Sequence, residues 1–418
     1  MRRSPLILIA TAFAIAVHPA IATPGTLDPR FSHDGIATAF GGGSVATAVA
    51  IDHAGRTVVA GYTVDTHVDV AVARFLPDGT LDPSFGGNGR VRMTLGADAA
   101  LAFDVAVAGD NGLAIAGRWT GGGIENSFVL RLDPGGKPVA GFGVDGLAIV
   151  NFGKQESANA VAFAPSGAID IGGYASNGVT MRSALARLRP AGTLDPAFAG
   201  NGKLLLDLSP GAEQVNDLVV LPRGDIVAAG YAEYATMPRF AIFRVHGGGD
   251  LAARFGHGGV TRTDLGPGAD IANAIAVTGA GGFVLAGSAA NGAEGDWGIV
   301  RYTPKGLPDP TFGNGGVVIL AWSSAPERAD DLVSVGAKLL VAGRIHRTST
   351  GDDVGVVRLR ADGSLDPTFA INGVARIDVH GSTDAAHGIA LQPNGKIVAA
   401  GETWANGVPR FLVIRLTA

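Results

Sequence analysis

The sequence predicts an all-β fold: a seven-bladed β-propeller of four-stranded blades. Three observations support this prediction. A motif returns at a nearly fixed interval, each interval holds four short apolar segments, and the chain starts with one strand and ends with three. A long fixed period is the signature of a propeller or a solenoid, and four strands per period are typical of a propeller blade.

Residues 1–22 differ from the rest and have the pattern of a secretory signal peptide. Two arginines precede the apolar run PLILIATAFAIAV, and AIA at 20–22 offers a small-residue cleavage site before Thr23. The run is too short to span a bilayer comfortably, so a retained membrane anchor is the weaker alternative. We expect a secreted or periplasmic protein with no transmembrane segment after cleavage.

Composition narrows the possible partners. The chain has 32 basic and 37 acidic residues, whereas a nucleic-acid partner would require a basic surface, so we expect no nucleic acid. It contains no cysteine, so packing alone has to stabilise it outside the cytoplasm.

The repeated motif is a turn, clearest as GTLDPSFGGNG at 79–89. Close copies stand at 25–35, 192–202 and 363–373. Successive units begin 54 to 57 residues apart, at Gly25, Gly79, Gly136, Gly192, Gly249, Gly306 and Gly363. The seven units account for residues 23–418 as a single propeller domain.

Each unit contains four apolar segments bounded by turn-forming residues. In one unit they are DVAVA, LAIAG, SFVLRL and LAIVNF, between residues 104 and 152. Branched and aromatic residues in partial alternation favour strands, and no segment has the sustained period and caps of a helix.

The phase of the chain ends favours a closed ring. After the signal peptide the chain begins with one strand, GIATAF at 35–40, and it ends with three strands between 388 and 416. The N-terminal strand is therefore predicted to pair with the last blade, which hides the free sheet edges. An open solenoid would need atypical capping repeats, and none is visible.

Three columns are invariant among the units. A phenylalanine of the turn is present each time, at Phe31, Phe85, Phe142, Phe198, Phe255, Phe312 and Phe369. A glycine follows four residues later, where we expect a positive φ. An arginine near the end of the third strand recurs at Arg74, Arg131, Arg187, Arg244, Arg301, Arg358 and Arg415. We expect it to pair with the Asp of LDP and with turn carbonyls, while an anionic ligand is the weaker alternative.

These motifs resemble the delta-60 repeat family of bacterial β-propellers. The resemblance rests on DG-LDP-F--NG, on G-IVAAG ending at Gly401 and on RL before the turn, and it covers residues 23–418. Two units lack LDP, at 136–142 and 249–255. The resemblance implies a secreted or surface propeller and supplies no catalytic residues.

Two polar columns are candidates for a functional site. The first strand of each unit should line the channel, and it opens with Thr47, Asp104, Asn159, Asn216, Asn273, Asp330 and His387. Three residues earlier stand Ser44, Leu101, Glu156, Glu213, Asp270, Glu327 and Asp384. Both columns are expected as rings at one channel mouth, where the oxygens could hold a cation such as Ca²⁺. The favoured alternative is that they cap loops, because Asp and Asn readily bond nearby backbone.

The loops between second and third strands should open on the same face. They are the most variable part of the unit, and Trp119 and Trp404 lie in or beside them, as does Tyr234, with Trp322 in a loop between blades. Aromatic residues in variable loops on a rigid scaffold suit ligand or partner binding, and local packing is an equally open alternative.

The sequence predicts a function class rather than a substrate. It has no G-x-S-x-G, H-E-x-x-H or Walker-type motif, so we expect a monomeric, non-enzymatic binding or scaffold protein. Its ligand or partner would be an extracytoplasmic protein or glycan, bound on the loop face at the channel mouth. The alternative is a polysaccharide hydrolase or lyase that uses carboxylates at that mouth.

Overall fold

The computed structural model describes residues 23–96, 98–235, 237–291, 294–349 and 351–418. The expected signal peptide at 1–22 lies outside these ranges. Within them the chain forms 28 strands and no helix, so the all-β prediction is confirmed. Accordingly, no helix in the described part of the chain is able to cross a membrane.

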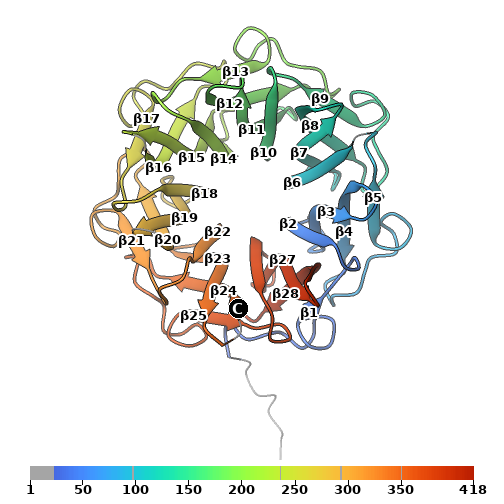
Figure 1. The fold of residues 1–418 in the computed structure, drawn as a ribbon, viewed down its shortest axis with the longest axis vertical. Helices are drawn as coiled ribbons and strands as arrows, with labels where there is room; N and C mark the ends of the chain where they lie inside the picture. The colour runs from blue at the N-terminus through green and yellow to red at the C-terminus, as the bar shows by residue number, and fades with distance from the viewer. Residues whose placement is uncertain (1–22, 97, 236, 292–293, 350) are drawn as a thin grey trace, which may run out of the picture.

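The strands form four-stranded antiparallel sheets set around a central axis, as in a propeller (Figure 1). The strands nearest the axis are β2 (Ser44–Ile51), β6 (Ala99–Val107), β10 (Gln155–Phe163), β14 (Glu213–Val220), β18 (Asp270–Val277), β22 (Arg328–Val335) and β26 (Asp384–Leu391). The next strands outward are β3 (Thr57–Val64), β7 (Leu113–Gly121), β11 (Ile169–Ser176), β15 (Ile226–Tyr234), β19 (Phe283–Asn291), β23 (Lys338–Arg347) and β27 (Ile397–Ala405).

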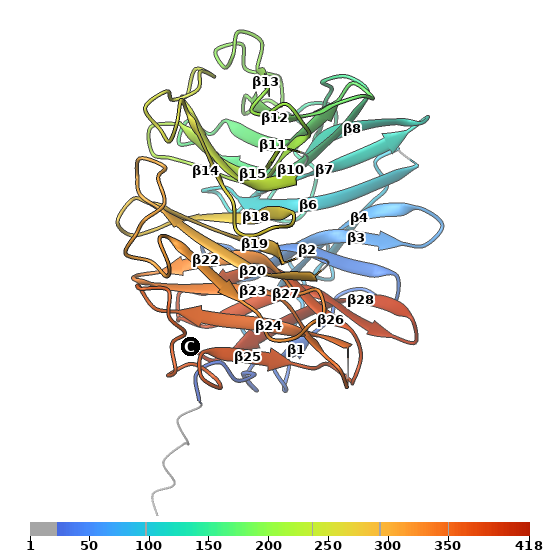
Figure 2. The ribbon, with the colours of Figure 1, turned by 60° about the vertical axis from the view of Figure 1, so that its left-hand side comes forward.

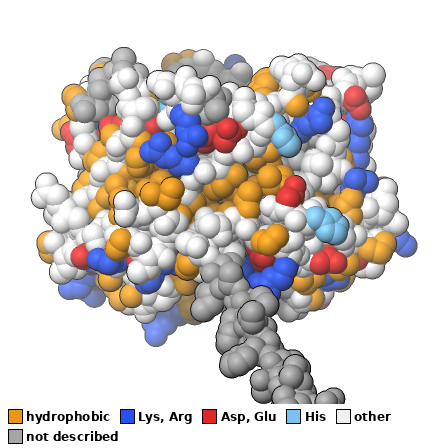
Figure 3. Space-filling view, turned by 90° about the horizontal axis from the view of Figure 1, so that it is seen from below, with side chains coloured by type: hydrophobic (Ala, Val, Ile, Leu, Met, Phe, Trp, Pro, Cys, Tyr) orange, Lys and Arg blue, Asp and Glu red, His pale blue; other side chains and the backbone are white. Residues whose placement is uncertain are grey.

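Two further layers complete the sheets toward the rim. The third strands are β4 (Val68–Phe75), β8 (Ile124–Leu132), β12 (Met181–Leu188), β16 (Met237–Val245), β20 (Glu294–Tyr302), β24 (Gly351–Leu359) and β28 (Val408–Leu416). The outer strands are β5 (Arg90–Met93), β9 (Leu147–Val150), β13 (Lys203–Leu206), β17 (Val260–Thr263), β21 (Val317–Leu320), β25 (Val374–Ile377) and β1 (Ile36–Ala37). A band of apolar side chains runs along this rim between charged ones (Figure 3).

The N-terminal strand β1 pairs with the last strand of the chain. Ile36 lies opposite Ile414, and Ala37 lies opposite Val413. The strand is shorter than the predicted 35–40. The sheet that contains β2–β5 is joined to the sheet β6–β9 by a single parallel bridge between Val68 and Ala99.

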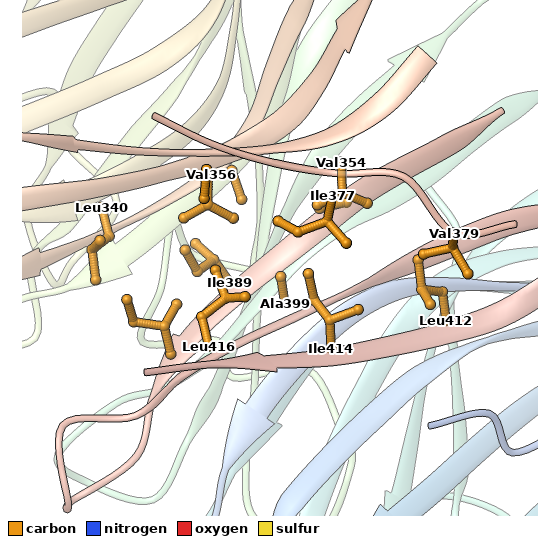
Figure 4. Close-up of a cluster of buried hydrophobic side chains, with 14 of the residues drawn as sticks. Leu340, Val354, Val356, Ile377, Val379, Ile389, Ala399, Leu412, Ile414 and Leu416 are labelled. Carbon is orange, nitrogen blue, oxygen red and sulfur yellow. The ribbon is translucent and has the colours of Figure 1, made fainter. Parts of the chain in front are cut away.

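The core consists of apolar clusters between neighbouring sheets, which lie face against face (Figure 2). In the cluster of Figure 4, Leu340 and Val356 from one sheet meet Ile389, Leu412 and Ile414 from the next. Each cluster is shared between two sheets. A sheet is therefore stabilised mainly by the apolar side chains that it buries against the sheets on either side.

A β-bulge interrupts every innermost strand. It explains the glycine that recurs in the second strand of each unit, as at Gly401, the last residue of IVAAG. In β26 the register shifts between Ala386 and Gly388, beside Gly401 of β27. A Cβ on Gly401 would lie 1.9 Å from the carbonyl oxygen of Ala385. Only glycine allows that approach, and the same contact occurs at Gly61, Gly117, Gly173, Gly230, Gly287 and Gly343.

The turn phenylalanine and the strand arginine form one unit of packing. All seven phenylalanines are at most 2% exposed, and the glycines four residues later have positive φ, as expected. In one unit the Arg358 guanidinium lies 4.7 Å from the ring centroid of Phe369, and its Nε donates to Asp366 at 2.9 Å. Arginine therefore stacks on the buried ring while its charge is paired.

In two units the arginine pairs with an aspartate outside its own turn. Arg244, whose unit carries Ala252 in place of Asp, pairs with Asp225 at 2.7 Å. Arg187 donates to both oxygens of Asp170 rather than to the Asp of its own LDP. Its Nη1 also donates to the carbonyl of Gly247 in the next unit, at 2.8 Å. The expected structural role of this column is therefore supported by its contacts.

Candidate functional site

The bulges place one residue of each innermost strand beside the central axis. These residues are Thr47, Phe103, Asn159, Asn216, Asn273, Asp330 and His387. The sequence alignment of the second unit is thus wrong by one residue, because Phe103 and not Asp104 occupies the bulge. In the column three residues earlier, the residue of this unit is therefore Ala100 rather than Leu101.

Polar bulge residues bond to the next innermost strand. The amide nitrogen of Asn159 donates to the Val215 carbonyl at 2.9 Å. Asn216 donates to Ala272, and Asn273 donates to Ala329, both at 2.8 Å. Each amide has a second N–H and a carbonyl oxygen, so these side chains can be oriented by the fold and still bind a ligand.

A cavity of about 330 Å³ lies at the axis, lined from all seven innermost strands. The seven bulge residues take part in its wall, as do Gln214, Arg328 and the aspartates described below. Its size is at the lower end of the range for small-molecule sites, which is about 300–1,000 Å³. Seven short strands thus converge on one polar chamber.

His387 is the most strongly perturbed basic group in the cavity wall. Its Nδ1 lies 3.2 Å from Asp330 Oδ2, and its Nε2 lies 3.7 Å from Glu402 Oε1. Burial lowers the pKa of His387, but the hydrogen bonds and charges of the two carboxylates outweigh burial and raise the pKa to about 9. Burial raises the pKa of Asp330, but its hydrogen bond to His387 and its ion pair with Arg328 outweigh burial and keep that pKa lowered. Contacts with His387 likewise keep the pKa of Glu402 lowered despite burial.

Three aspartates follow the bulge in alternate sheets: Asp104, Asp217 and Asp331. Each accepts one hydrogen bond from the next residue and one from the following innermost strand, at Val161, Ile275 and Ile389. Burial raises the pKa of Asp104 to about 6 and that of Asp331 to about 7. Burial and the charges of the other two raise the pKa of Asp217 well above its ordinary value.

The five carboxylates of the second column cap loops, as the favoured alternative predicted, and do not form a ring that faces the channel. Their residues are at most 1% exposed, and each accepts a backbone N–H from the loop before its strand. These are Glu156 from Phe152 and Gly153, Glu213 from Leu208, Asp270 from Leu265, Glu327 from Trp322, and Asp384 from Val379.

The physical reason for this correction is strand alternation. Side chains three residues apart point to opposite faces of a strand. The bulge residue lies in the cavity wall, whereas the residue three before it is turned away from the cavity and, at Glu213 and Asp270, toward an arginine of the preceding sheet. Burial consequently raises the pKa of Glu213 to about 7 and that of Asp270 to about 6.

The aromatic residues singled out in the sequence have three different environments. Trp119 donates its indole N–H to the Leu95 carbonyl at 3.1 Å, and Trp322 packs edge-on against Trp297. Trp404 differs, because its side chain bonds to Glu402 and helps lower the pKa of that carboxyl group. Tyr234 is 61% exposed at the end of β15.

Sequence reasoning missed several residues of the cavity wall: Gln214, Asp217, Arg328, Asp331 and, behind His387, Glu402. The repeated glycine of the second strand was the available signal. It marks where the innermost strand bulges and therefore which neighbouring positions share a face.

Comparisons with known proteins support a β-propeller family. Five segments match the family model described as a domain of unknown function (DUF5122) beta-propeller: residues 55–85, 164–198, 284–312, 338–369 and 392–418. No curated protein matches the sequence. The name delta-60 repeat remains a resemblance.

Solved structures are similar in fold alone. Virginiamycin B lyase from Staphylococcus aureus is 11% identical, with 92% of this chain and 98% of that chain covered and a TM-score of 0.54. Polysaccharide lyase Uly1 is 9% identical, with 91% and 92% covered and a TM-score of 0.48. Sqt1 from Chaetomium thermophilum is 13% identical, with 91% and 97% covered and a TM-score of 0.49.

Proposed function

We propose that the chain is an exported, non-enzymatic seven-bladed β-propeller that binds a polyhydroxylated ligand, such as the end of a glycan, in its central cavity. The observation that carries this proposal is the polar chamber of about 330 Å³ lined by all seven innermost strands. The sequence predicted binding on the loop face at the channel mouth, whereas this proposal places the ligand deeper, against the bulge residues.

Pairing of β1 with the last sheet supports the proposed closed ring and a rigid chamber within it. Besides the two strand pairs, Leu27 bridges to Leu416, and Asp28 lies 3.1 Å from Arg415. One apolar cluster joins Phe31 and Val59 to Val398 and Phe411, across the junction of the first and last sheets. A ring with fixed neighbours holds its inner side chains in place, which favours binding by a prepared site.

The chemistry of the wall suits hydroxyl groups. Amide and carboxylate groups offer donors and acceptors at several points, and Phe103 adds an apolar face. Arg328 and His387 supply positive charge beside Asp330, so an acidic sugar would find a cationic side of the chamber. Export, inferred from residues 1–22, would place the protein among such ligands.

A glycan-binding screen with the full mature chain tests this proposal. We expect a bound glycan whose affinity falls at least about tenfold in Asn273→Ala and His387→Gln, because each loses a polar contact in the wall. Arg223→Ala, in an exposed turn between β14 and β15, should bind like the wild type. Binding that all three variants retain would place the ligand elsewhere.

A second function, a polysaccharide lyase or hydrolase, is favoured by one observation. His387, held between Asp330 and Glu402 with a pKa of about 9, carries a proton at neutral pH and can donate it to a leaving oxygen. The glycan that binds would then be cleaved, with new reducing or unsaturated ends released. His387→Gln should abolish turnover and leave a folded chain, whereas binding without any cleavage by the wild type favours the first function.

A further inference from the structure

We propose a second site, for a hard divalent cation with Ca²⁺ preferred, where Asp353, Asp378 and Asp384 meet. It is separate from the central cavity. Asp353 is the third residue of β24, Asp378 directly follows β25, and Asp384 begins β26. One oxygen from each carboxylate lies within 4.8 Å of the other two, which is close enough for a single ion to contact all three.

Strand register brings these residues together. Val354 pairs with Ile377, so the residues next to them, Asp353 and Asp378, lie side by side at the end of the β24–β25 ladder. Figure 4 shows Val354 and Ile377 next to each other, with Val379 nearby, in the apolar cluster beneath this point. The core therefore fixes the backbone that carries the three carboxylates.

One oxygen at this position is buried and has no hydrogen-bond partner. Asp384 is 0% exposed, and its Oδ2 accepts the Val379 N–H at 2.6 Å. Its Oδ1 is also buried and has no hydrogen-bond partner, as is true of Oδ1 of the equivalent Asp270, which has Arg239 3.9 Å from its other oxygen. A buried carboxylate oxygen without a donor is unfavourable unless a cation contacts it.

In two other units an arginine balances the charge at the same position, whereas Asp69 and Asp296 occupy it in two further units. Five residues before the strand arginine stand Arg182 and Arg239, where this unit has Asp353. Arg182 lies 3.4 Å from Asp207 and 3.6 Å from Glu213. Arg239 lies 3.2 Å from Asp264 and 3.9 Å from Asp270. In both units a guanidinium thus sits between the two carboxylates that correspond to Asp378 and Asp384.

In this unit a carboxylate replaces that guanidinium. Asp353 has its own partner, because Arg347 Nε lies 3.2 Å from its Oδ2, and Gly381 N–H donates to Asp378 at 2.7 Å. Three carboxylates thus meet where Arg347 pairs with one of them, so negative charge is in excess when all three are ionised. A divalent cation supplies the positive charge that Arg182 and Arg239 supply in their units, and an all-oxygen donor set selects Ca²⁺ or Mg²⁺ over softer metals.

Calorimetric titration of the chelator-treated chain with CaCl₂ tests the site. We expect one Ca²⁺ to bind and millimolar Ca²⁺ to raise the melting temperature by roughly 2–4 °C, reversibly with chelator. Asp353→Arg, which introduces the residue found at Arg182 and Arg239, should abolish both responses and stay folded. Asp378→Asn should weaken Ca²⁺ binding at least about tenfold.

Asp264→Asn is the matched control. It removes the residue equivalent to Asp378 in a unit where Arg239 is present, so the Ca²⁺ response should be unchanged. A wild type without any Ca²⁺ or Mg²⁺ response, or a response that survives Asp353→Arg, would overturn the proposal. His387→Gln should keep the Ca²⁺ response, so failure of the glycan proposal and failure of this one are distinguishable.

Discussion

His387 Nδ1 lies 3.2 Å from Asp330 Oδ2, so the innermost strands of two adjacent sheets are joined by an ion pair in the wall of the central cavity. Elsewhere in the ring the corresponding link is neutral, as where Asn273 donates to the Ala329 carbonyl. An ion pair depends on pH and an amide hydrogen bond does not, so the stability of this junction should vary with pH.

Asp330→Asn should lower the pKa of His387 from about 9 toward its ordinary value, because the hydrogen bond to a charged acceptor is lost. In the wild type the folded state holds a proton between pH 6.5 and about 9 that the unfolded chain releases. The contribution of the ion pair to the free energy of unfolding is fully present below pH 6.5 and is lost as the pH rises through 9. It is on the order of 1–3 kcal/mol.

NMR titration of the imidazole, with denaturant unfolding at pH 6 and pH 9, measures both effects. Arg223→Ala, in the exposed turn between β14 and β15, serves as the comparison and should leave the titration of His387 unchanged. An imidazole that titrates near pH 6.5 in the wild type would contradict the ion pair.

Arg187→Met should destabilise the fold by about 3–5 kcal/mol, because it leaves the buried Asp170 without the two hydrogen bonds that balance its charge. Arg131→Met is the matched comparison. Arg131 occupies the same column and lies over the Phe163 ring, but its unit has Val139 in place of the Asp, and its Nη1 is buried without a hydrogen-bond partner. We expect that variant to lose less than about 1 kcal/mol.

Urea unfolding of the two variants decides the point. Equal losses in both would mean that the arginine column contributes through ring stacking alone. A smaller loss in Arg187→Met than in Arg131→Met would contradict the role of Asp170.

The sequence predicted the features that all units share. It failed to predict which residues are equivalent where a unit differs from the others in register. Period, strand count and the Phe–Gly turn follow from spacing, and all are visible without coordinates. Asp104 was placed one residue out of register, because the units were aligned by polarity and the bulge residue there is Phe103.

The acidic column illustrates a second limit. Glu213 and its equivalents were grouped with the channel residues by sequence proximity, yet an odd offset turns them to the opposite face. Contacts such as that of Glu402 with His387 join residues in neighbouring strands, and no one-dimensional pattern specifies them.

Deletion of residues 23–40 should cause aggregation or lower the melting temperature by roughly 10 °C or more. The deletion removes β1, the buried Phe31 and the Asp28 partner of Arg415, and it exposes the edge of β28. The chain that starts at Thr23 is the control. A truncated chain that melts cooperatively at the control temperature would show that β1 does not close a ring.

Glu213→Gln should flatten the dependence of stability on pH. Burial raises the pKa of Glu213 from 4.5 to about 7, so between these values the folded state holds a proton that the unfolded chain releases. Stability therefore falls as the pH rises from 4.5 to 7, by on the order of 1–3 kcal/mol. The Gln oxygen can still accept the Leu208 N–H, so the variant should match the wild type at pH 4.5 and exceed it at pH 8. Urea unfolding at both pH values measures the difference. Asp145→Asn, which removes an exposed carboxylate in the turn before β9, should keep the wild-type slope. An unchanged slope in Glu213→Gln would show that Glu213 is ionised throughout in the wild type.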